Sequence, residues 1–158
     1  MKRILTIIVL ALIIVVAAMI LIKENATKDE FVSVKVFFNN SKLDPEFSCN
    51  KVFPVERMVL RVGDKKQEAL SELLSGPTQA EADEGFFTSI NSGVKIVSLS
   101  VNGNTANVEF DERLEEAVGG SCRVAAIRSQ ITQTLKQFYG IENVVISIGG
   151  RTEDILQP

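Results

Sequence analysis

The sequence predicts an α/β protein of the α+β type: a two-layer sandwich with one mixed sheet and two main helices on one face, preceded by a transmembrane helix. Three observations predict it: a long apolar run near the N-terminus, short stretches of alternating apolar and polar residues, and two stretches with apolar residues at helical spacing. The soluble elements follow in the order strand, strand, helix, strand hairpin, helix, strand. Strands with one polar face and helices with one apolar stripe are typical of a sheet covered on one side.

The apolar run covers residues 4–22, in which only Thr6 is polar. As a helix it would be about 28 Å long, close to the thickness of the hydrocarbon core of a bilayer. A cleavable signal peptide has a shorter apolar core, and the nearest cleavage-like triplet, at 24–26, carries an unfavourable Glu. We therefore expect residues 1–23 to be an uncleaved transmembrane signal anchor that crosses the cytoplasmic membrane through residues 4–22.

The segment after the anchor, residues 24–30, is polar and without periodicity, and we expect it to be a short tether. The chain has two cysteines, Cys49 and Cys122, too far apart in sequence for a local metal knuckle. An even pair in a membrane-attached chain predicts one disulfide in an oxidising compartment, and the alternative is two unrelated free thiols. Basic residues flank the apolar run on both sides and barely discriminate its orientation, so the cysteines favour a domain on the extracytoplasmic side.

The alternating stretches predict the strands. The first is expected at 31–38 and the second at 54–62. The second strand places these apolar residues on one face: Met58, Leu60 and Val62. A hairpin is expected next, with Val97, Leu99 and Val101 sharing one face of its first strand. The Asn102-Gly103 pair predicts its two-residue turn, because such a turn needs positive φ. A last strand is expected around 144–148.

Two helices are expected between these strands. Asp64 begins the first in capping-box form, and Gly76-Pro77 ends it. Ser121 is a candidate cap for the second and longer helix. Apolar residues at helical spacing mark the buried stripe of the second helix: Val124, Ile127, Ile131, Leu135 and Phe138.

The composition excludes several kinds of chemistry. The chain has no His, which excludes catalysis or metal binding by His. It also has no Trp. After Lys23 there are 14 basic against 20 acidic residues, which disfavours nucleic acid as a partner. Cys122 near a helix start has no His to act as its base, and Cys49 is an available partner. The acidic clusters are interpreted as solvated surface. We therefore expect no enzyme activity, no catalytic, cofactor-binding or metal-binding residues, and no cofactor.

Phe86 and Phe87 are a notable apolar pair in a loop-like region. They are interpreted as a plug for the edge of the sheet or, alternatively, as a partner surface.

Several runs, taken together, resemble the GerMN domain of bacterial sporulation and germination proteins: Leu73-Leu74-Ser75-Gly76-Pro77, Gly85-Phe86-Phe87-Thr88-Ser89-Ile90 with Gly93, Asn102-Gly103, and Ala106-Asn107-Val108-Glu109-Phe110. The resemblance covers about residues 32–150, so we expect a GerMN-like domain at 31–150 and a polar tail at 151–158. One departure is Asn91, where members of the family tend to have Pro.

The resemblance implies a small, non-enzymatic α/β module outside the cytoplasmic membrane that contacts other envelope proteins, with a link to sporulation or germination complexes. Homo-oligomers are a further candidate. The alternative is an accessory module that binds the cell wall or a small ligand, although the sequence shows no aromatic platform for glycans. An enzyme that uses carboxylates alone would need two buried acids facing each other in a cleft.

Overall fold

The computed structural model describes residues 12–17, 19 and 30–157 of the 158-residue chain. Residues 12–17 are helical. Within the described ranges, no helix has both the length and the apolar character needed to cross a membrane. Most of the predicted span at 4–22, and all of the predicted tether except Glu30, lie outside the described residues.

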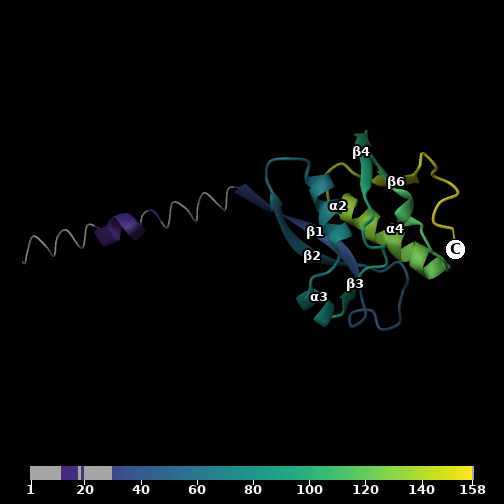
Figure 1. Cartoon of the computed structure of the whole chain (residues 1–158), viewed down its shortest axis with the longest axis horizontal. Coiled ribbons are helices and arrows are strands. Elements are labelled where there is room, and N and C mark those ends of the chain that lie inside the picture. The colour runs from purple at the N-terminus through teal and green to yellow at the C-terminus, as the bar shows by residue number, and fades with distance from the viewer. Residues whose placement is uncertain (1–11, 18, 20–29, 158) are drawn as a thin grey trace, which may run out of the picture.

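From Glu30 onward the chain alternates between strands and helices (Figure 1). The elements, in order, are β1 (Phe31–Asn40), β2 (Phe53–Leu60), α2 (Lys65–Ser75), α3 (Gln79–Asp83), β3 (Phe86–Phe87), β4 (Ile96–Asn102), β5 (Thr105–Phe110), the 3-10 helix η1 (Glu112–Leu114), α4 (Ser121–Lys136) and β6 (Asn143–Ile148).

The strands form two three-stranded sheets, so the prediction of a single sheet is wrong. The first sheet has the order β2-β1-β3 and is antiparallel. The second has the order β4-β5-β6 and is mixed, because β5 pairs antiparallel with β4 and parallel with β6. The division arises at β3, which has two residues and pairs only with Asn39 and Asn40 at the end of β1. The chain leaves the first sheet there and enters β4 as part of the second.

The α+β class with two main helices is confirmed. Helices α2 and α4 contact each other, and each contacts strands of both sheets (Figure 1). One apolar cluster joins all of these elements. It includes Val36 and Phe38 of β1, Leu70 and Leu73 of α2, Val108 and Phe110 of β5, Ile127, Ile131 and Leu135 of α4, and Ile146 and Ile148 of β6. The helices are therefore the shared packing layer for the two sheets.

Strand β2 buries the face opposite to its most regular apolar row. Val59 is buried, whereas Met58 and Leu60 are exposed. The cause is the pairing with β1, whose own strong alternation directs Val34 and Val36 into the core. Antiparallel partners share a face, and Met58 pairs with an exposed serine of β1 rather than with a buried valine.

Strand β4 also departs from its predicted face. The register shifts between Ile96 and Ser98, as in a β-bulge. The extra residue interrupts the two-residue period, so Ile96 packs against the core while Val97 is exposed. Leu99, beyond the bulge, also packs against the core, and Val101 is partly exposed.

The turns and ends show smaller differences. The predicted hairpin is present, with Asn102 paired to Thr105, so its two loop residues are Gly103 and Asn104. Gly103 has φ +60°, in the region that favours glycine. The N-cap of α4 is Gly120, so Ser121 is the first helical residue and not the cap. The tail was expected to be polar, but it contributes two core side chains, Ile155 and Leu156.

Candidate partner-binding site

A hollow of about 210 Å³ lies at the far end of β1 from the point where the described domain begins. Four segments form it: the end of β1, the loop at 41–52, the residues around β3, and the first turns of α4. Its lining includes Phe47, Cys49, Phe87, Cys122, Arg123 and Ala126. The hollow combines apolar side chains with a few polar ones beside a loop that a disulfide fixes, so it is the candidate functional site.

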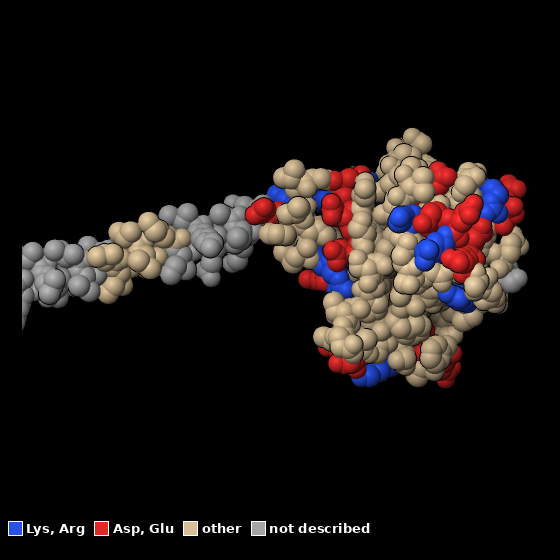
Figure 2. All heavy atoms as spheres, in the orientation of Figure 1, with Lys and Arg blue, Asp and Glu red and all other residues tan. Residues whose placement is uncertain are grey.

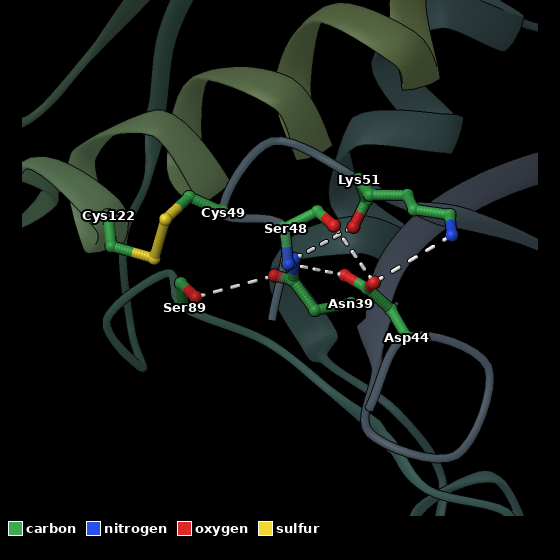
Figure 3. The surroundings of a disulfide bond; sticks show 7 residues. All are labelled: Asn39, Asp44, Ser48, Cys49, Lys51, Ser89 and Cys122. Atoms are coloured by element: carbon green, nitrogen blue, oxygen red, sulfur yellow. Dashed lines mark hydrogen bonds and ion pairs between the residues drawn. A yellow bond between two sulfur atoms is a disulfide. The ribbon is translucent and has the colours of Figure 1, made fainter. Parts of the chain in front are cut away.

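A disulfide joins Cys49 of the loop to Cys122 in the first turn of α4, as the sequence predicts (Figure 3). The two Cα atoms are 4.8 Å apart, although 73 positions separate the residues in sequence. The bridge therefore fixes a loop without regular structure to the longest helix of the domain.

Hydrogen bonds hold the rest of this loop (Figure 3). The backbone N–H of Ser48 donates to the Asp44 carboxylate at 2.7 Å, and its hydroxyl donates to the other oxygen at 3.0 Å. The Lys51 ammonium lies 3.7 Å from the same carboxylate. The Asn39 side chain donates to the Lys51 carbonyl at 3.0 Å, which joins the end of the loop to β1.

Two phenylalanine rings form the apolar mouth of the hollow. The centroids of Phe47 and Phe87 are 6.2 Å apart, and the rings are inclined by 49°. Phe47 is 59% exposed, a large exposed fraction for an aromatic side chain in a loop that a disulfide holds. Its backbone φ of +52° lies in the left-handed region, which non-glycine residues rarely adopt.

The predicted partner surface is thus divided by the structure. Phe87 lies at the hollow, whereas Phe86 packs against the main core. The sequence reasoning missed Phe47. The available signal was its place as the one aromatic residue in the loop at 41–52, two positions before Cys49.

Asn39 and Arg123, two polar side chains in the lining of the hollow, are hydrogen-bonded to other side chains. The buried side chain of Gln130 donates to Asn39 Oδ1 at 2.6 Å and accepts from the Thr88 hydroxyl at 2.8 Å. Arg123 at the rim donates to Asn91 Oδ1 at 2.6 Å and to two backbone carbonyls. Among the described residues, no buried side-chain polar atom is without a partner. The hollow therefore presents apolar contact area and leaves no buried polar group that requires a ligand.

An ion-pair network fixes the helix that leads to β3. The guanidinium of Arg57 on β2 makes a two-pronged contact with the Glu81 carboxylate on α3, one bond of which is 2.6 Å, and its Nε lies 3.4 Å from the Glu72 carboxylate on α2. The hydrogen bond from Arg57 lowers the pKa of Glu81, and the same bond raises the pKa of Arg57. Glu81 also accepts from the backbone N–H of Thr78, which completes a capping box.

The acidic residues do not converge on a catalytic cleft within the described part of the chain. Of the described carboxylates only Asp44 is buried, and Ser48 and Lys51 occupy its oxygens. Glu109, Asp111, Glu112 and Glu116 line an open hollow around η1 together with the basic Arg113. Figure 2 shows acidic and basic side chains mixed on the face of the domain that it displays. No group of three or more potential ligands among the described residues could hold a metal ion.

The fold and the site define a class of protein: a small, disulfide-stabilised α+β module that presents an aromatic hollow. Residues 35–154 match the family described as "Germane: Sporulation and spore germination", and the chain belongs to this family. The predicted GerMN resemblance is therefore confirmed.

Solved structures share the fold. The tandem GerMN domains of the sporulation protein GerM from Bacillus subtilis superpose with a TM-score of 0.59 at 18% identity, over 77% of this chain and 40% of that one. The first GerMN domain of the same protein gives 0.54 at 18% identity, over 77% and 85% of the two chains. A protein from Clostridium perfringens assigned as a lipoprotein gives 0.51 at 16% identity, over 81% of each chain. At these identities the likeness concerns the fold. No curated protein matches the chain.

Proposed function

We propose that this chain is a membrane-anchored envelope protein whose extracytoplasmic domain binds another protein through the hollow at Phe47 and Phe87. The observation that carries the proposal is an aromatic ring, 59% exposed, on a loop that the disulfide fixes. Rigid aromatic side chains beside an apolar pocket are the usual anchors of protein interfaces.

The size of the hollow favours a side chain as its occupant. At about 210 Å³ it is smaller than most small-molecule sites, which enclose roughly 300–1,000 Å³. One aromatic or branched aliphatic side chain of a partner fits such a space better than a glycan does. This favours a protein partner over the cell-wall or small-ligand alternative.

Two further points support a location of the domain outside the cytoplasm, on a membrane anchor. The disulfide is typical of proteins that fold outside the cytoplasm, and the apolar run at 4–22 has the length of a single span. The fold neighbours include a sporulation protein and a protein assigned as a lipoprotein, which is consistent with an envelope role and with a link to sporulation or germination complexes.

Cross-linking in cells tests the binding surface. The full chain and its Phe47→Ser variant are expressed in the native organism, and covalent complexes with other envelope proteins are compared. We expect the substitution to remove specific complexes. Val97→Ser is the matched control, because Val97 is 61% exposed and lies on β4. Complexes that survive Phe47→Ser as well as they survive Val97→Ser would contradict this surface.

Fractionation tests the anchor independently. The protein should remain with the membranes after an alkaline carbonate wash, as an integral membrane protein does, and release into the wash would contradict the anchor.

A further inference from the structure

Exposed apolar side chains gather at the end of the domain where the described chain begins. We call Met58, Leu60, Val62 and Tyr139 the tether-end surface. Their exposed fractions are 63%, 45%, 86% and 106%. Leu60 pairs directly with Phe31, the first residue of β1, and the backbone N–H of Arg61 donates to the Glu30 carbonyl at 2.7 Å. The end of β2 therefore lies beside the entry of the chain into the domain.

Tyr139 belongs to the same end, although it comes much later in the sequence. It lines a shallow hollow together with Lys66, which lies in the first turn of α2, four positions after Val62. The preceding residue, Phe138, packs against the small apolar cluster of Val34, Val59 and Ala69, and so does Val32 near the start of β1. The turn after α4 and the loop after β2 therefore both lie at the tether end.

The short connection to the apolar run limits what this end can face. Nine residue steps join Ile22 to Phe31, which reach at most about 32 Å when fully extended. A domain of this size has a radius of gyration of about 14 Å. With the run in a bilayer, the tether-end surface would thus lie within one domain diameter of the headgroups.

The composition of the surface suits a bilayer interface. Tyrosine and protruding aliphatic side chains are enriched where protein meets the headgroup region. Around Val62 the charges are nearly balanced, with Arg61, Lys65 and Lys66 against Asp64 and Glu68, in a domain that is acidic overall. Two of these charges form an ion pair within the domain, since the Lys66 ammonium lies 2.9 Å from the Asp64 carboxylate. Repulsion from anionic lipids is therefore weaker here than over the rest of the domain.

We propose that the tether-end surface rests in the headgroup layer of the membrane and fixes the orientation of the domain. The inference rests on the proposed anchor. The ten residues of β1, which extend over about 33 Å, separate this end from the loop that carries Phe47 (Figure 1). A domain seated on the bilayer in this way presents its partner hollow away from the lipid.

The absence of Trp gives a direct test. Three single-Trp variants of the full chain, Val62→Trp, Tyr139→Trp and Phe47→Trp, are reconstituted into phosphatidylcholine–phosphatidylglycerol vesicles with or without bromine on the acyl chains. Bromine quenches Trp only at short range. We expect about a twofold loss of fluorescence for the two tether-end variants and almost none for Phe47→Trp, because an interfacial group lies only about 5–10 Å into the boundary.

The outcomes separate the anchor from the surface. If the protein floats with the vesicles but neither tether-end Trp is quenched, the anchor stands and the membrane-contact surface is refuted. A blue-shifted but unquenched Trp would show that protein covers the surface, and equal quenching at all three positions would show no fixed orientation; either result overturns the proposal. A chain that does not float refutes the anchor and this inference together.

A second variant guards against an effect of the introduced Trp itself. The substitutions Leu60→Ser and Val62→Ser are added to the Tyr139→Trp variant. They should weaken the membrane contact and so restore most of the Trp fluorescence of that variant in brominated vesicles, while circular dichroism confirms an intact fold. Unchanged quenching in that variant would also overturn the proposal.

Discussion

Replacing both cysteines tests how far the disulfide stabilises the domain. The double variant Cys49→Ser, Cys122→Ser removes the bridge without leaving a single reactive thiol. The bridge closes a loop across 73 positions, for which the chain-entropy relation gives a stabilisation of about 4 kcal/mol, because an unfolded chain without the bridge has more conformations. For a domain of this size, such a loss lowers the midpoint of thermal unfolding by about 15 °C.

Urea denaturation at neutral pH and calorimetry measure both quantities. Reducing the wild-type domain should reproduce the result of the double variant, and Ser121→Ala, beside the bridge but without a capping role, should stay near the wild type. Amide exchange should rise most in the loop at 41–52, which has no regular secondary structure and otherwise depends on hydrogen bonds within itself and to residues around β1 and β3. A loss below about 1 kcal/mol would refute the reasoning, since it would mean that the bridge barely restricts the unfolded chain.

Three further predictions concern side chains and turns that fix the site. Glu81→Gln should lower the free energy of unfolding by about 2 kcal/mol at pH 7. The bond from Arg57 lowers the pKa of Glu81, so the stabilisation by this carboxylate is fully present above the ordinary value of 4.5 and fades as pH falls through the lowered pKa. In urea denaturation the wild type and the variant should therefore differ at pH 7 and approach each other as the pH is lowered. Gln130→Leu leaves two partners without their bonds and should cost about 2–3 kcal/mol by denaturation, whereas Gln133→Leu, exposed on the same helix, should be nearly neutral. Gly85→Ala places a Cβ 2.9 Å from a lysine side chain at φ +93° and should lower the thermal midpoint at a cost of about 1–3 kcal/mol, whereas Gly119→Ala, with open space, should not.

The sequence correctly predicted features that depend on the spacing of nearby residues, such as the buried face of a helix or the turn of a hairpin. The apolar spacing of α4 fixed its buried face, because a helix imposes its period along its whole length. The hairpin was predicted from a glycine turn between two alternating runs, and the disulfide was predicted from an even pair of cysteines in a chain expected to be attached to a membrane.

The features that sequence reasoning missed depend on pairing between distant segments. The register between β2 and β1 decides which face of β2 is exposed. Apolar and polar residues alternate in both strands, and the alternation alone does not tell which residues of the two strands pair. The bulge at Ile96 and Ser98 adds one residue to the strand, which no count of apolar positions reveals. The second sheet follows from the shortness of β3, and the importance of Phe47 follows from a loop that a disulfide attaches to a helix far away in the sequence.

The burial of Ile155 and Leu156 has a consequence for how the domain can be shortened. Both side chains belong to the central apolar cluster, although they come after the last strand, β6. The folded unit therefore extends beyond its last regular element and beyond residue 154, where the match to the family ends. A fragment cut at residue 154 would lose two core side chains, each worth about 2–5 kcal/mol. A fragment prepared for binding experiments should therefore keep residues 155 and 156.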